Sequence, residues 1–259
     1  MNVLVIGDSH VGVAQDLRRF KAASNLILEK KPEYILSIGD FLTMSSLSAW
    51  DLNKRALMEG RRYQEDLFIG NEALDLLQSG VVALNNKAQR YKKKLYTPKW
   101  IYVEGNHEYW EHAYTLQHAE LIGILDYKRD LRLYERGFIH VPYREYIYLN
   151  GVGFTHVPMN TINKPITVYN NVNKALAMHD RSVVFGHHHK LTHTEEWRHG
   201  AEDLNQALCV GCFMEFNTEQ YSIGSKLDWW QGILLLDIYK HNRFDFQTIS
   251  MESLLTKYL

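Results

Sequence analysis

The sequence has 259 residues, of which 46% are apolar and 23% are charged, as in an ordinary globular protein. A chain of this length can bury a sizeable core, so it needs no disulfide or metal merely to fold. The formal net charge of −1 gives no global attraction to nucleic acid or anionic lipid, and any such contact must depend on local patches.

The cysteines and the apolar segments favour a cytoplasmic protein. Cys209 and Cys212 are the two cysteines, which argues against a disulfide framework. Their C-x-x-C spacing is compatible with a zinc or redox site, but we interpret them as small residues of a strand. The N-terminal apolar run is too short for a signal peptide, and we find no run approaching the ~20 apolar residues of a membrane span.

The first elements follow a strand-helix-strand order. An apolar strand covers residues 3–8, and a helical pattern over 16–30 ends before Pro32. A second strand covers 34–38. This order predicts that the first two strands are parallel.

Residues 45–97 form an unexpected helical insertion. Apolar residues at helical spacing predict two helices joined by a turn at Ser79-Gly80 and ending at Pro98. The segment also carries basic residues: Lys54, Arg55, Arg61, Arg62, Arg90 and Lys92 to Lys94. A run of charged residues usually forms the solvated face of a helix, and we interpret these basic residues in that way. Because the segment leaves directly from the Asp40 loop, a cap that meets a phosphate-bearing substrate is the alternative.

The second half contains more strands than helices. We predict a strand over 100–104, a helix over 111–125, and short strands over 131–134, 138–141 and 144–149. Asn150-Gly151 is a type I′ hairpin signal before a strand arm over 152–156. A helix over 172–180 and strands over 182–185, 207–214, 231–239 and 243–250 complete the chain. With no repeat or linker between the halves, we predict a single domain over 1–259.

Metal-competent side chains follow four of the apolar runs, each directly after a glycine. These side chains are Asp8 and His10, Asp40, Asn106 and His107, and His187 and His189. The hairpin arm adds His156 at its end. Ligands of open α/β sheets gather outside the carboxyl ends of the strands, so these side chains can share one site. In the triple histidine, His187 and His189 can face one side while His188 faces away.

The set offers carboxylate, imidazole and amide donors without a thiolate. These donors suit Mn²⁺, Fe or Zn²⁺ better than Ca²⁺ or a structural zinc. A single catalytic metal takes three protein ligands and a water. Seven donors therefore divide between two ions if one carboxylate bridges them, and Asp40 stands alone at its loop.

The order of these motifs resembles that of the calcineurin-like metallophosphoesterase superfamily over residues 8–189. The resemblance implies an α/β fold, a two-sheet β-sandwich flanked by helices, and two divalent ions, with Mn²⁺ favoured over Fe, Zn²⁺ and Ni²⁺. It implies that Asp40 bridges the ions and that His107 lies at the substrate, where it protonates the leaving group or stabilises the phosphate. The remaining ligands would be Asp8, His10 and His189 for the first ion, and Asn106, His156 and His187 for the second.

One departure from the superfamily narrows the substrate. Protein phosphatases carry Asp-Arg-Gly shortly after the bridging Asp, and here Asp40 is followed by Phe-Leu-Thr-Met-Ser. The chain is more similar to the phosphodiesterase and nuclease branches and to phage-encoded members. We therefore expect a phosphodiesterase acting on nucleic acid or a nucleotide diester. The alternatives are a phosphomonoesterase acting on a protein or small molecule, and a non-catalytic scaffold; the oligomeric state is open.

Overall fold

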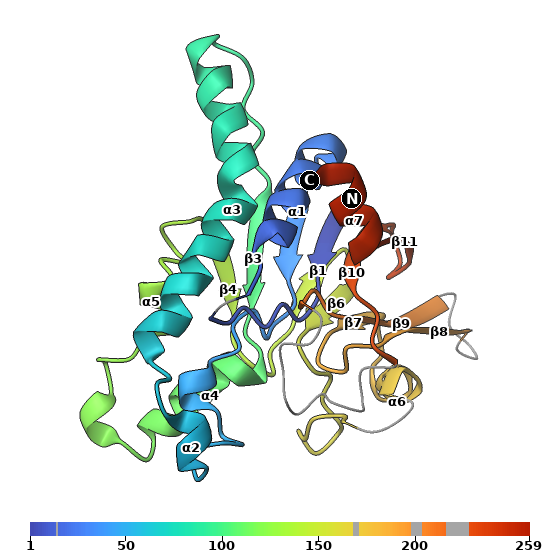
Figure 1. Cartoon of the computed structure of the whole chain (residues 1–259). Coiled ribbons are helices and arrows are strands. Elements are labelled where there is room, and N and C mark those ends of the chain that lie inside the picture. Colours follow the sequence, from blue (N-terminus) through green and yellow to red (C-terminus); the bar gives the residue numbers. More distant parts are fainter. Residues whose placement is uncertain (14, 168–170, 198–203, 216–227) are drawn as a thin grey trace.

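The computed structural model describes residues 1–13, 15–167, 171–197, 204–215 and 228–259. The described strands form two mixed sheets, and helices cover their outer faces (Figure 1). This arrangement confirms the predicted two-sheet sandwich flanked by helices.

The first sheet contains six strands in the order β11-β10-β1-β2-β3-β4. Their bounds are β1 (Asn2–Ile6), β2 (Tyr34–Ser37), β3 (Lys99–Val103), β4 (Phe138–Val141), β10 (Gly232–Ile238) and β11 (Phe244–Ser250). Strands β1 to β4 are parallel, and β10 and β11 extend the sheet in antiparallel fashion beside β1. Helix α1 (Arg18–Lys30) connects β1 to β2, so the predicted parallel strand-helix-strand unit is confirmed.

The second sheet contains five strands in the order β5-β6-β7-β9-β8. Their bounds are β5 (Ile147–Leu149), β6 (Val152–Thr155), β7 (Val183–Phe185), β8 (Leu191–Trp197) and β9 (Leu204–Val210). Strands β6, β7 and β9 are parallel, so their carboxyl ends point the same way. Asn150 and Gly151 have φ values of 46° and 90° between β5 and β6, as a type I′ turn requires.

Alternating side chains of the strands fill the layers of the sandwich. Val3 and Val5 of β1 belong to the core between the two sheets, whereas Leu4 and Ile6 face the helices. Phe185 of β7 belongs to a third, smaller core. The helices on the first sheet are α1, α3 (Tyr63–Arg90) and α7 (Met251–Tyr258), and α6 (Asn171–Met178) covers the second sheet (Figure 1).

The predicted turn at Ser79-Gly80 is wrong, because α3 runs unbroken from Tyr63 to Arg90. The Gly80 amide donates to Ser24 Oγ of α1 at 2.9 Å, and a β-carbon at Gly80 would lie 2.7 Å from the same oxygen. Gly80 therefore allows two helices to approach closely and does not end one. By length and composition α3 could cross a membrane, but 39% of its most apolar window is buried in this fold.

Other boundaries differ from the prediction. The expected strand over 131–134 is a set of turns after α5 (Tyr127–Asp130), with Leu131 and Leu133 buried and Arg132 at a φ of 53°. These turns reproduce the alternating pattern of a strand. The expected helix over 111–125 is α4 (Asn106–Thr115) followed by η2 (Ala119–Leu121). The insertion begins with η1 (Ser45–Leu47) and α2 (Arg55–Met58). Strand β8 and helix α7 were not predicted.

Candidate metal centre

The predicted site residues lie in loops directly after strands of both sheets. Asp8 and His10 follow β1, Asp40 follows β2, and Asn106 and His107 begin α4 after β3. The second sheet contributes His156 after β6, and His187 and His189 after β7. The structure brings together all eight residues, because each contacts another member of the set.

Asp8, His10 and His189 form one group of three possible metal ligands. His189 Nε2 lies 3.1 Å from Asp8 Oδ2 and 3.1 Å from His10 Nε2. One ligand atom from each residue falls within 4.8 Å of the others. Two buried polar atoms of this group, Asp8 Oδ1 and His10 Nδ1, have no hydrogen-bond partner among the described residues. The geometry and the donor types therefore fit a bound cation.

Asp40, His156 and His187 form a second group with the same spacing. His156 Nε2 lies 3.3 Å from Asp40 Oδ2 and 3.3 Å from His187 Nδ1. Asn106 Oδ1 lies 3.1 Å from the same His156 nitrogen. Four donor atoms therefore converge around one point, as a second cation would require.

Main-chain oxygens fix the orientation of two imidazoles. His156 Nδ1 donates to the Ile38 carbonyl at 3.0 Å, and His107 Nδ1 donates to the Thr43 carbonyl at 2.7 Å. Because a carbonyl can only accept, the proton of each neutral ring is on Nδ1, and Nε2 faces the cluster. An outer hydrogen bond of this kind orients metal-binding histidines.

The loops that carry these side chains have an unusual backbone. His10, Asp40, His187 and His189 have φ values of 42°, 46°, 71° and 57°. Non-glycine residues rarely adopt this left-handed region, and such strain clusters at functional sites.

Two of the strand-ending glycines allow these loops to meet. A β-carbon at Gly39 would collide with the His156 ring, and one at Gly105 would collide with Asp40. Gly39 and Gly105 therefore leave room for a residue from another loop of the site.

The electrostatics of the cluster favour binding a cation. Burial lowers the pKa of His10, with a further contribution from the neighbouring His107, and burial also lowers the pKa of His187. Burial opposes charge on Asp40, but the imidazoles of His156 and His107 hold its pKa well below its usual range. Burial opposes charge on His156 as well, yet Asp40 raises its pKa to about 9. A cation bound between Asp40 and His156 would replace the proton that these two side chains otherwise share.

Glu108 connects the loop that follows β2 to the loop that follows β3. Its carboxylate accepts the amide hydrogens of Leu42 at 2.8 Å and Gly105 at 2.9 Å, and the Tyr102 hydroxyl at 3.1 Å. Burial, followed by the charge of Asp40, raises the pKa of Glu108 to about 8. Glu108 is also an acid in the first turn of α4, at its third position.

A cavity of about 930 Å³ opens over the site. It is lined by site residues and by the start of the insertion: His10, Asp40, Thr43, Ser45, Ser48, Trp50, Asp51, Lys54, Leu57, Arg61, Asn106, His107, Trp110, His187 and His189. Sequence reasoning missed Trp50, Trp110 and the carbonyl of Thr43. The Trp110 ring lies 3.9 Å from that of His107, and the Trp229 ring lies 4.3 Å from that of His189. An aromatic side chain gives no sign in the sequence that it borders a metal site.

His188 does not join the site. Its Nε2 lies 3.0 Å from the Ile166 carbonyl, outside both ligand groups, although its ring contacts that of His187. The cysteines are also separate from the site: both are buried and free, and Cys209 belongs to the core under α6. Cys209 lies in β9, as predicted, whereas Cys212 lies beyond the end of this strand in an isolated β-bridge with the main chain of Asp8.

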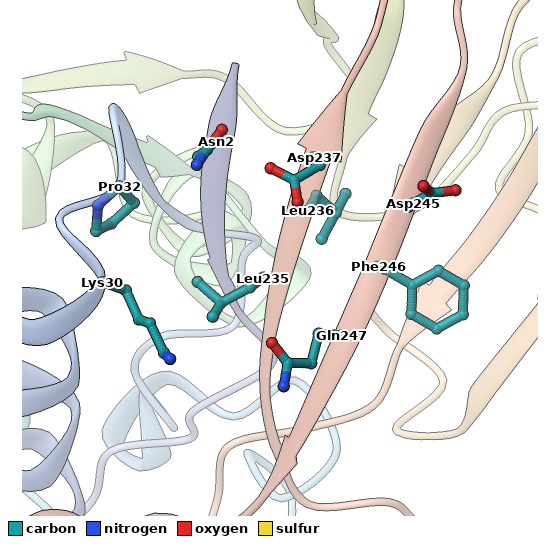
Figure 2. A pocket seen from close by; sticks show the side chains of 9 residues that line it. All are labelled: Asn2, Lys30, Pro32, Leu235, Leu236, Asp237, Asp245, Phe246 and Gln247. Atoms are coloured by element: carbon teal, nitrogen blue, oxygen red, sulfur yellow. The ribbon is translucent and has the colours of Figure 1, made fainter.

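A smaller cavity of about 300 Å³ lies at the other end of the first sheet (Figure 2). Its lining comes from the start of β1, the end of α1, and β10 and β11: Asn2, Lys30, Pro32, Leu235, Leu236, Asp237, Asp245, Phe246 and Gln247. Since Asn2 begins β1 and Asp8 follows its end, this cavity is separate from the metal centre.

A match to one protein family agrees with this geometry. No curated protein sequence matches the chain. One solved crystal structure aligns over 96% of this chain and 99% of its own length, with 11% identity and a TM-score of 0.41. The family model for calcineurin-like phosphoesterases matches residues 1–218. The chain therefore belongs to the calcineurin-like phosphoesterase family and is a metal-dependent phosphoesterase.

Proposed function

We propose that the protein is a dinuclear phosphodiesterase that acts on nucleic acid or a nucleotide diester. The observation that carries this proposal is the position of the Asp40 carboxylate. Its Oδ2 lies 3.3 Å from His156 Nε2 in one ligand group, and 3.9 Å from His10 Nε2 in the other. One carboxylate therefore adjoins both groups, as a bridging ligand must.

The ligand assignment uses two of three possible ligand groups; the third consists of His10, Asp40 and His107. Asp8, His10 and His189 would hold the first ion, and Asn106, His156 and His187 would hold the second. Asp40 would bind both. When bound, such a pair of ions supplies positive charge at the phosphoryl oxygens and lowers the pKa of a water molecule. Nitrogen and oxygen donors without a thiolate support a transition-metal ion, and among these ions we propose Mn²⁺.

His107 lies where it can act on the substrate. Its Nε2 is 3.9 Å from Asp40 Oδ2 and faces the cavity, because Nδ1 is bonded to the Thr43 carbonyl. The Trp110 ring packs against the imidazole and restricts its rotation. Because Nδ1 already carries a proton, His107 can donate from Nε2 only as an imidazolium, which would pass the Nε2 proton to the departing oxygen and leave the neutral ring; we assign His107 this role.

The segment after Asp40 supports a diester more than a monoester. Phe41, Leu42 and Met44 are fully buried, and Met44 belongs to the hydrophobic core. This segment therefore presents no arginine to a phosphate dianion. A diester carries a single negative charge and needs less clamping by cations. Among the described residues lining the cavity, the lysine and arginine side chains are Lys54 and Arg61, both from the insertion.

Hydrolysis of two nitrophenyl esters tests the proposal. With added Mn²⁺, we expect faster turnover of bis(p-nitrophenyl) phosphate than of p-nitrophenyl phosphate, and no turnover after EDTA treatment. Faster turnover of the monoester would instead identify a phosphomonoesterase. Metal analysis of the purified protein addresses the scaffold alternative, which would be favoured if the protein bound no metal and cleaved neither ester.

A further inference from the structure

One part of the cavity lining has an unusual composition. It is formed by residues 45–61, which connect Asp40 to α3. Trp50 lies in this part of the lining with 75% of its surface exposed, which is rare for an indole ring. Leu57 and Trp110 also line the cavity, so apolar and aromatic side chains share it with the candidate metal ligands.

Two basic side chains, Lys54 and Arg61, also line the cavity, and ion pairs with Asp51 hold both of them in place. Asp51 accepts from Lys54 Nζ at 2.9 Å and from Arg61 Nη1 at 3.0 Å, so the three side chains carry a net charge of +1. Arg61 Nη1 also donates to the Ser45 carbonyl at 3.0 Å. Each hydrogen bond that the Arg61 guanidinium makes within the described parts of the chain uses Nη1, which leaves Nε and Nη2 for a ligand.

The other basic run of the insertion lies elsewhere. Lys92 to Lys94 follow the end of α3, whereas Lys54 and Arg61 precede its start. A continuous helix of 28 residues is roughly 40 Å long. Figure 1 shows α2 and the carboxyl end of α3 at opposite ends of the molecule. The basic residues at the cavity are therefore a local feature of residues 50–61.

We infer that Trp50, Lys54 and Arg61 form a nucleotide subsite next to the metal centre. The indole of Trp50 stacks on a nucleobase. The Lys54 and Arg61 side chains contact the phosphate of the next nucleotide along a single strand. Stacking on an exposed aromatic side chain beside cations is how single strands are held without sequence preference. A small alkyl diester has no flat ring to offer, so this subsite favours nucleotidic diesters. The inference rests on the proposed phosphodiesterase function.

Two esters that share a leaving group test the stacking. Thymidine 5′-(p-nitrophenyl phosphate) and methyl p-nitrophenyl phosphate differ in the nucleoside alone. Base stacking is worth ~1–3 kcal/mol. We therefore expect Trp50→Ala to reduce the ratio of kcat/KM for the nucleoside ester to that for the methyl ester by about 5- to 160-fold. Trp50→Phe should restore most of the ratio. Phe68→Ala, at an exposed α3 position (65%) outside the cavity lining, is the matched control.

Binding provides a second measurement that does not depend on activity. A fluorescein-labelled oligothymidine is titrated with the protein in EDTA at several salt concentrations. Loss of one phosphate contact in Lys54→Gln should reduce the slope of log K against log salt by about 0.7. We expect Trp50→Ala to weaken binding at every salt concentration with little change of slope.

The outcomes separate this inference from the proposed function. If the wild-type protein with Mn²⁺ hydrolyses neither ester, the proposed function fails. If it hydrolyses both esters and Trp50→Ala leaves their ratio unchanged, the subsite is refuted while the phosphodiesterase stands. An unchanged salt slope in Lys54→Gln would remove the phosphate contact from the subsite.

Discussion

The imidazole Nδ1 of His107 lies 2.7 Å from the main-chain oxygen of Thr43. Protein phosphatases of the superfamily orient the corresponding histidine with an acid after the bridging Asp, which this chain lacks. A backbone carbonyl takes over that task here. Because a carbonyl cannot become protonated, it fixes one tautomer without adding charge to the site.

We expect His107→Gln to slow cleavage of a diester with an alkyl leaving group by roughly 10²- to 10⁴-fold. The loss should be about tenfold or less for bis(p-nitrophenyl) phosphate, because nitrophenolate leaves without a proton. Steady-state kinetics on both substrates gives the comparison, with manganese content measured for each preparation. Equal losses on the two substrates would instead assign His107 to phosphate stabilisation.

Neighbouring histidines provide a matched pair for the metal centre. His189 lies 3.1 Å from Asp8 Oδ2, whereas His188 contacts the Ile166 carbonyl. His189→Ala should lower the manganese bound after dialysis from two ions per chain towards one, because a ligand is lost. His188→Ala should keep both ions. Elemental analysis measures both variants, and a normal manganese content in His189→Ala would contradict the ligand assignment.

Glu108→Ala should reduce the free energy of unfolding by roughly 2–5 kcal/mol, because it leaves the buried amides of Leu42 and Gly105 without an acceptor. Urea unfolding in EDTA measures this loss apart from metal binding. The exposed Glu145→Ala is the control and should change stability by about 0.5 kcal/mol or less. A Glu108→Ala variant as stable as that control would show that other groups join the two loops.

Gly80→Ala should destabilise the protein by about 1–3 kcal/mol, since its β-carbon would press on Ser24 of α1. Alanine has the higher helix propensity by about 1 kcal/mol, so a purely local effect would have the opposite sign. Asn86→Ala, at an exposed position of α3, should stabilise by a few tenths of a kcal/mol. Thermal unfolding of the two variants separates packing from propensity.

Cys209 and Cys212 should resist alkylation in the folded protein. Burial raises the pKa of each thiol to about 12, so both stay protonated at pH 8 while unfolded thiols partly ionise. Mass spectrometry after iodoacetamide treatment should find no label in the native state and two labels in guanidinium. Rapid labelling of the native protein would mean that these residues are reactive.

Much of the site could be predicted because its signal is local. Gly105 and the residue after it are typical of a strand end followed by a metal-competent side chain. The order of these motifs along the chain then indicates the family and the role of each ligand. The helical insertion was harder, because Gly80 reads as a break until the packing of α1 against α3 is known. Trp50 and the Thr43 carbonyl could not be foreseen, since one depends on tertiary placement and the other is a main-chain atom.

Both ligand groups draw side chains from the two sheets. Asp8 and His10 follow a strand of the first sheet, whereas His189 follows a strand of the second; Asp40 faces His156 in the same way. Cations bound there would cross-link the halves of the sandwich, and their affinity for the folded state would add directly to its stability. Heat resistance and catalysis should then depend on the same metal concentration, so that a metal-starved cell would lose the protein itself along with its activity.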